Sequence, residues 1–185
     1  YVYVDTIKGR RLGNQMFMLA TAFSIAKTNS RKCIMGNNTA HYMLEHFPMA
    51  GSVCPIGEKP TNDWRLYVRK YGFDESQLYP PLQNVTIHGF IYTWKYFAST
   101  FDDIRDIFRS DRVAQRRASK FLQEIVVIEM NTTFVGVHIR RGDRSGARQY
   151  EAGVRLPTAG FFYNAMAYYK VKYKNVHFVV CSDNI

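Results

Sequence analysis

The feature that most constrains the fold is a strand, glycine turn, helix and strand within the first 35 residues. Residues 1–5 are β-branched or aromatic and predict a short strand. A turn bounded by two glycines follows at residues 9–13, and Asn14 is a suitable N-cap for the helix after it. Lys32–Met35 predicts a second strand. The helix has apolar residues at steps of four and three, which predict a single apolar face: Leu12, Met16, Leu19, Phe23 and Ala26. This βαβ order predicts an α/β fold with parallel strands.

The same order returns near the end of the chain. Residues 133–139 predict a buried strand, residues 158–174 a helix and residues 177–181 another strand, after which only four residues remain. A parallel strand is normally covered by helices on both faces, and no helix follows this one in the sequence. We therefore expect a fragment, with an N-terminal α/β domain at 1–131 and the incomplete start of a second domain at 132–185.

The sequence between these two units carries weaker patterns. It predicts a strand at 85–92, a loop at 52–60, and helices at 41–47, 94–108 and 111–129, the last with Asp111 as its N-cap.

Composition narrows the class of protein. The 185 residues are 46% hydrophobic and 22% charged, which is typical of a globular chain and excludes general disorder. No apolar run is long enough to span a membrane, and the strand-like first residues lead us to expect no signal peptide. The 25 Lys and Arg residues against 15 acidic ones leave a net charge of +10, which favours an anionic partner. The three cysteines have no metal-binding spacing, so their pairing stays open.

Three N-glycosylation sequons are also present, at Asn37, Asn84 and Asn131. They are compatible with exposure to the secretory pathway, although each can arise by chance.

The strongest cluster follows the predicted strand at 133–139, where the sequence continues His138-Ile-Arg140-Arg141-Gly-Asp143. Two guanidinium groups then lie at the carboxyl end of a parallel strand, where open α/β sheets bind ligands. Arginine donors match phosphate oxygens two at a time. Asp143 can hold one arginine, and His138 can support the loop. The alternative is an exposed basic loop with a salt-bridged aspartate, and an Arg-Gly-Asp adhesion signal is a weaker one.

Two further clusters are less specific. Gly13, Asn14 and Gln15 open the first helix, where unpaired N–H groups and the helix dipole favour an anion. The same residues equally suit a simple helix start. Ser182 and Asp183 end the last strand, where a carboxylate can accept donors from a base such as guanine. They also suit the N-cap of a following helix.

Taken in order, these motifs resemble the galactoside α-1,2-fucosyltransferases of glycosyltransferase family 11. The resemblance runs from Gly9 to Asp183 through GxxxGNQ, VGVHxRRGD and FVVxSD. It implies an inverting GT-B enzyme with two Rossmann-like domains, the second one truncated here, that transfers fucose from GDP-fucose to the 2-hydroxyl of a terminal galactose. No metal or other cofactor is expected. Animal members are commonly single-pass Golgi proteins with a lumenal catalytic domain, so a membrane anchor would lie outside this chain.

The resemblance also implies residue roles. Arg140 and Arg141 would bind the diphosphate as the catalytic pair, with His138 and Asp143 supporting the loop. Within the N-terminal domain, expected to face the acceptor, the residues near the diphosphate or sugar would be Gly13, Asn14 and Gln15. Ser182 and Asp183 would lie near the guanine or the ribose of the nucleotide. Three residues depart from the usual motifs, and they concern fine donor contacts and acceptor choice: the second arginine of Arg10-Arg11, Arg144 and Asn184.

Two other functions remain open from the sequence. A catalytically inactive relative would bind glycan or nucleotide without transferring sugar. A basic nucleic-acid-binding module would fit the charge and the 15% aromatic content, but no nucleic-acid-binding motif is visible. The general base and the acceptor glycan are not identified by any motif, and we expect the 185 residues alone to be inactive.

Overall fold

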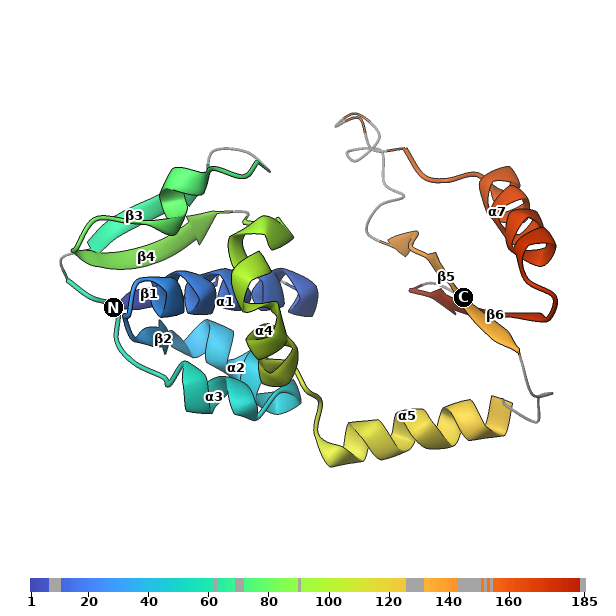
Figure 1. Ribbon diagram of the computed structural model, residues 1–185, viewed down its shortest axis with the longest axis horizontal. Helices are drawn as coiled ribbons and strands as arrows, with labels where there is room; N and C mark the ends of the chain where they lie inside the picture. Colours follow the sequence, from blue (N-terminus) through green and yellow to red (C-terminus); the bar gives the residue numbers. More distant parts are fainter. Residues whose placement is uncertain are drawn as a thin grey trace. The chain divides into compact units, whose positions relative to one another are not determined.

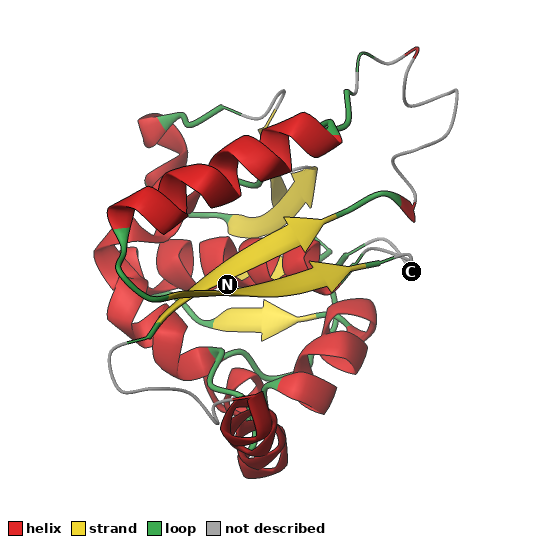
Figure 2. Cartoon of the chain, turned by 90° about the vertical axis from the view of Figure 1, so that its right-hand side faces the viewer, coloured by secondary structure: helices red, strands yellow, loops and turns green. Residues whose placement is uncertain are grey.

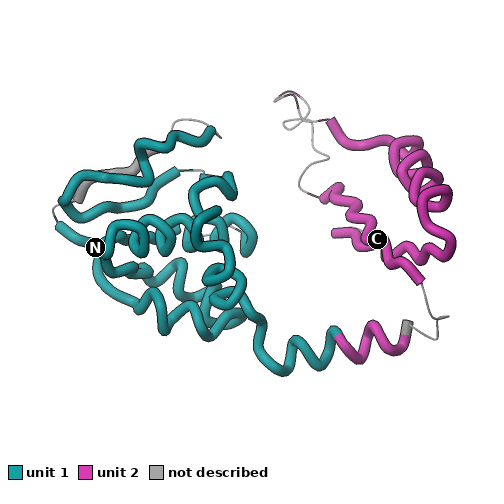
Figure 3. The backbone as a smooth tube through the Cα atoms, in the orientation of Figure 1, with its two compact units in different colours: residues 1–118 teal, residues 119–185 magenta. Residues whose placement is uncertain are grey.

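The computed structural model describes residues 1–6, 11–61, 63–68, 72–89, 91–125, 132–142, 151, 153 and 155–183, with residues 63–68 and Ile125 described by their backbone alone. The chain divides into two compact units, residues 1–118 and 119–185 (Figure 3). The division falls within a helix, α5 (Arg112–Ile125). The domain boundary predicted at Asn131 lies outside the described residues.

Unit 1 is built on a four-stranded sheet in which every pair of neighbours is parallel (Figure 1). Its strands, in the spatial order β2-β1-β4-β3, are Cys33–Met35, Val2–Val4, Asn84–Gly89 and Asp63–Val68. Strand β1 pairs with β2 on one side and β4 on the other, and its Val2 and Val4 are fully buried. The α/β class and the parallel strands predicted from the sequence are confirmed. Strand β3 was not predicted.

Helices and 3-10 turns complete unit 1: α1 (Leu12–Thr28), α2 (Asn37–His46), α3 (Met49–Val53), η1 (Glu75–Leu78), η2 (Trp94–Thr100) and α4 (Phe101–Ile107). The helices predicted at 41–47 and 94–108 are confirmed, the second as a 3-10 segment followed by α4. The predicted strand at 85–92 is shorter than expected, because β4 ends at Gly89 with a positive φ of 91°.

Helix α1 corrects two predictions. Its N-cap is Arg11 and not Asn14, since Arg11 has an extended backbone and the helix begins at Leu12, which packs against the core. The single apolar face is also wrong, because buried residues surround the helix and include polar Gln15, Thr21 and Ser24. The physical reason is that α1 packs against β1 and β2 and also against α2 and η2. A helix enclosed in this way has no solvent face on which an amphipathic pattern would show.

Unit 2 contains a second pair of parallel strands, β5 (Thr133–Ile139) and β6 (Val176–Ser182), joined through α7 (Ala159–Lys172). Figure 2 shows α7 alongside the two strands. The three predicted elements are confirmed, and Thr158 caps α7 by accepting the N–H of Phe161 at 3.4 Å. The prediction that β5 is buried is wrong. Its residues alternate between half-buried and exposed, because successive side chains of a strand point to opposite faces.

A disulfide between Cys33 and Cys54 joins β2 to the residue after α3, while Cys181 is a free, exposed thiol. Asp111 caps α5 as predicted, by accepting the N–H of Ala114 at 2.7 Å. Among the described residues, no helix combines the length and the apolar character needed to cross a bilayer.

Candidate functional site

The two arginines of the strongest motif line one small cavity in unit 2. Arg140 is half-buried and Arg141 is exposed, directly beyond the end of β5. The cavity measures about 120 Å³, and the rest of its lining is His138, Ile139, Leu156, Pro157 and Phe162. A basic pocket at the carboxyl end of a parallel strand is where an α/β sheet binds an anionic ligand. Asp143, the remaining member of this motif, lies outside the described residues.

The end of β6 meets the start of the arginine loop. The register pairs His138 with Cys181 and Ile139 with Ser182, so Asp183 lies one step beyond the last pair. The Oδ1 atom of Asp183 accepts the backbone N–H of Arg141 at 2.8 Å and of Gly142 at 3.2 Å. These two hydrogen bonds stabilise the carboxylate and lower the pKa of Asp183, and the nearby Arg140 charge adds to the effect. Unit 2 therefore brings five predicted residues to one edge of its sheet: His138, Arg140, Arg141, Ser182 and Asp183.

The other predicted donor residues belong to unit 1 and lie on the first turn of α1. Gly13 is exposed, with no heavy atom within 4 Å of the position a Cβ would take, and Asn14 is half-buried. The first turn carries no acidic side chain, and Arg11 provides no side-chain cap. The first N–H groups of a helix have no intrahelical partner, so this end can receive an anion.

Gln15 has a different environment from its neighbours. Its side chain is 0% exposed, and its Oε1 accepts the hydroxyl hydrogen of Thr6 at 2.5 Å. The backbone N–H of Thr6 in turn donates to Oγ1 of Thr39 at 3.0 Å. Gln15 thus joins a buried polar network between β1, α1 and α2.

The sequence reasoning missed Asp5, which follows the carboxyl end of β1 next to this network. Its two carboxylate oxygens accept the N–H of Thr39 and the side-chain amide of Asn38, each at 3.1 Å. Burial and the proximity of Asp5 raise the pKa of Tyr3. Gly36 is required beside them, because a Cβ there would overlap Asp5 and the Tyr3 hydroxyl. The position of Asp5 directly after a strand could have indicated a site residue from the sequence. In the structure, both of its carboxylate oxygens accept hydrogen bonds from α2.

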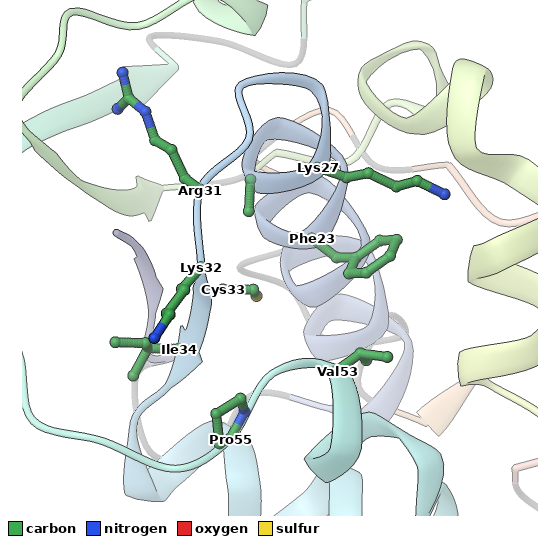
Figure 4. A pocket seen from close by; sticks show the side chains of 9 residues that line it. Phe23, Lys27, Arg31, Lys32, Cys33, Ile34, Val53 and Pro55 are labelled. Atoms are coloured by element: carbon green, nitrogen blue, oxygen red, sulfur yellow. The ribbon is translucent and has the colours of Figure 1, made fainter.

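A second cavity, of about 410 Å³, is larger than the arginine cavity and lies in unit 1. It is found at the amino end of β2, beside Cys33 (Figure 4). Figure 4 shows Arg31 and Lys27 extending away from Cys33. Lys27 pairs with Asp103 at 2.6 Å, and the Arg31 guanidinium donates to backbone carbonyls of Pro80, Pro81 and Gln83. With two of its three cations engaged and an apolar interior, this cavity does not suit a diphosphate.

The sequons occupy different positions. Asn37 is exposed at the first residue of α2, whereas Asn84 is half-buried at the start of β4 and accepts a hydrogen bond from the Tyr1 amino group. Asn131 lies outside the described residues. Within the described part of the chain, no three His, Cys, Asp or Glu side chains form a group that could hold a metal ion.

Comparison with known proteins identifies the family. Residues 3–185 match the sequence profile described as "Glycosyl transferase family 11". The chain belongs to glycosyl transferase family 11. This membership confirms the resemblance found in the motifs.

Curated relatives of this family 11 chain are similar along nearly all of it. Galactoside 2-alpha-L-fucosyltransferase SEC1 of Bos taurus is 25% identical over 185 residues, which cover 100% of the chain and 50% of the relative. Galactoside alpha-(1,2)-fucosyltransferase 2 of Mus musculus is 26% identical over 176 residues, 95% of the chain and 51% of the relative. The chain thus spans about half the length of the curated relatives it matches.

Proposed function

We propose that this chain is part of a fucosyltransferase that transfers fucose from GDP-fucose to the 2-hydroxyl of a terminal galactose on a glycan. The family and the names of its relatives support this activity. The observation that carries the proposal is the cavity at the end of β5, which Arg140 and Arg141 line together. A diphosphate is the part of GDP-fucose that such a pair of guanidiniums recognises best.

The proposed reaction is a single displacement at the anomeric carbon of fucose, with inversion. The acceptor 2-hydroxyl oxygen forms the new bond to that carbon, the bond to the β-phosphate oxygen of GDP breaks, and its electron pair leaves with GDP. Negative charge builds on the departing diphosphate, where Arg140 and Arg141 stabilise it in the transition state. Two fixed cations perform the task that a divalent metal performs elsewhere, so the proposal includes no metal cofactor. The acceptor proton goes to a base that the proposal does not name.

The proposed architecture is GT-B, with two Rossmann-like domains. Unit 2 belongs to the proposed donor-binding domain, and Gly13 and Asn14, on the first turn of α1 in unit 1, are proposed donor-binding residues. Gln15 supports that turn through Thr6. We expect the 185 residues alone to lack transferase activity, since relatives of this family are about twice as long.

The proposed location is the lumen of the Golgi, with any membrane anchor outside this chain. Support comes from the Cys33–Cys54 disulfide, because disulfides persist in oxidising compartments and are rare in the cytosol. The exposed sequon at Asn37 is compatible with the same compartment.

The test is Arg141→Ala in the full-length protein, assayed for fucose transfer from GDP-fucose to a galactose-terminated acceptor. We expect kcat to fall about 10²- to 10³-fold, as for the loss of one donor to a developing anion. Arg116→Ala is the matched control, because it removes an exposed arginine from α5 and is expected to leave kcat within twofold.

Near-normal transfer by Arg141→Ala with an intact fold would refute the assigned role. GDP binding by the wild type without any transfer would indicate an inactive relative that binds nucleotide, and RNA binding with no response to GDP would indicate a nucleic-acid-binding protein.

A further inference from the structure

Asp183 occupies a place in unit 2 that its motif does not explain. Its Oδ1 accepts two successive backbone N–H groups, those of Arg141 and Gly142, across a gap of 41 to 42 residues in sequence. Both residues lie shortly after the end of β5, and Arg141 lines the cavity together with Arg140. The carboxylate is thus bonded to the loop that carries the candidate catalytic arginines.

We propose that Asp183 is a positioning residue that clamps the Arg141–Gly142 backbone and thereby aims both guanidiniums into the anion cavity. The inference rests on the proposed function for the identity of the anion. The two hydrogen bonds of the Asp183 carboxylate are seen in the structure and do not depend on the proposed function.

Gly142 leaves room for the carboxylate of Asp183, because it has no side chain. A Cβ at residue 142 would lie 3.0 Å from Oδ2 of Asp183, closer than an ordinary van der Waals contact. The glycine therefore lets the carboxylate approach the backbone closely enough for its other oxygen to accept both N–H groups. A side chain there would push the carboxylate away from its donors.

The clamp acts at an exposed edge of unit 2. Arg141 and Gly142 are both exposed, and the sheet beneath them has two described strands. Asp183 joins the end of one strand to the chain leaving the other, and charge-assisted hydrogen bonds are about twice as strong as neutral ones. Loss of the clamp would let the guanidinium of Arg141 move, and a misplacement of about 1 Å can reduce a rate 10²-fold.

The competing role for Asp183 is recognition of guanine, for which a carboxylate would offer one oxygen to each of two N–H groups of the base. In the structure Oδ1 is already engaged by two backbone donors, and Oδ2 faces Gly142. This arrangement favours the clamp. The two roles also predict opposite behaviour for the isosteric amide.

The experiment compares Asp183→Asn and Asp183→Ala in the full-length protein. Asparagine keeps an oxygen that accepts both N–H groups, whereas alanine keeps none. We expect kcat to fall about 10²-fold in Asp183→Ala and to stay within about tenfold of wild type in Asp183→Asn, because a neutral acceptor still forms the bonds. The KM for the glycan acceptor should stay within about twofold in both, since the clamp acts on the donor side.

A second measurement reports on the clamp without using activity. Hydrogen exchange of the peptide containing Arg141 and Gly142 should be several-fold faster in Asp183→Ala than in wild type, and close to wild type in Asp183→Asn. Exchange in β1 and α1 serves as the control for overall folding. If the wild type neither binds GDP nor transfers fucose, the proposed function fails, and this exchange measurement still decides on the clamp.

Titration with GDP and with inosine diphosphate, which lacks the 2-amino group of guanine, separates the two roles. The clamp predicts that Asp183→Asn keeps the wild-type preference between the two nucleotides. Loss of that preference in Asp183→Asn would overturn the proposal in favour of base recognition. Unchanged exchange at Arg141 and Gly142 in Asp183→Ala would overturn it as well.

Discussion

The two units differ in how they are stabilised. In unit 1 the strands and α1 contribute a continuous set of fully buried side chains, including Val2, Leu19, Ile25 and Ile87. In unit 2 no described side chain is buried, and residues such as Tyr163 and Val171 of α7 are exposed. Within these 185 residues, the proposed catalytic arginines therefore lie on the less buried unit, next to polar contacts such as those of Asp183.

The largest expected contrast comes from the same truncation in the two units. Leu19 of α1 is 0% exposed, whereas Leu122, in the part of α5 that belongs to unit 2, is 47% exposed. Leu19→Ala should lower the free energy of unfolding by about 2–5 kcal/mol, because it leaves a cavity in a packed core. Leu122→Ala should lower it by less than about 1 kcal/mol, since the side chain already contacts water.

Urea denaturation of the full-length protein, followed by circular dichroism, measures both values. Equal losses would contradict the difference in burial, because they would mean that Leu122 is as buried in solution as Leu19.

The disulfide of unit 1 is expected to contribute a similar amount of unfolding free energy. Cys33 and Cys54 are separated by 21 residues, and closing a loop of this length restricts the unfolded chain. Cys54→Ala should therefore cost about 3 kcal/mol of unfolding free energy. Cys181→Ala, which removes the free exposed thiol of unit 2, should leave stability within about 0.5 kcal/mol. Denaturation with and without a reductant tests this, and a wild type insensitive to reductant would contradict it.

The sequence predicted most elements, because their signals are local. The run that forms β5 and the cap Asp111 both depend on neighbouring residues. Strand β3 was missed, since it lies at the edge of the sheet and its pairing with β4 is set by a partner about 20 residues away. The apolar face of α1 was wrong for a similar reason, because tertiary contacts enclose the helix on several sides.

The candidate site also has one part that local sequence predicts and another part that depends on tertiary structure. The arginines at the end of β5 followed from a strand and a motif that are contiguous in sequence. The contact of Asp183 with Arg141 joins residues 42 apart, and the burial of Gln15 depends on packing around α1. Sequence reasoning identified these residues as important, but their hydrogen-bond partners follow from tertiary structure.

A smaller effect is expected from the helix caps. Asp111 accepts the N–H of Ala114 at 2.7 Å, and Thr158 accepts the N–H of Phe161 at the longer distance of 3.4 Å. Asp111→Ala should cost about 1 kcal/mol of unfolding free energy, and Thr158→Ala about 0.5 kcal/mol, at the low end for cap residues. Thermal unfolding of the two variants tests the order. A larger loss for Thr158→Ala would show that the start of α7 is held more tightly than its geometry indicates.

The smallest expected effect is a pH dependence confined to the arginine loop. The N–H groups of Arg141 and Gly142 lower the pKa of Asp183 in the folded protein, so the carboxylate binds its proton less readily than in the unfolded chain. The stabilisation is complete above the unfolded pKa and is lost as the pH falls through the lower folded value. The chemical shift of the Asp183 carboxyl carbon should therefore stay constant from neutral pH through the ordinary aspartate range and change only below it. Asp183→Asn should abolish this transition while leaving the shifts of β1 unaltered, because its side chain does not titrate. A transition at the ordinary aspartate pKa in the wild type would show that the clamp does not form in solution, and the arginine loop would then lack the support that the structure assigns to it.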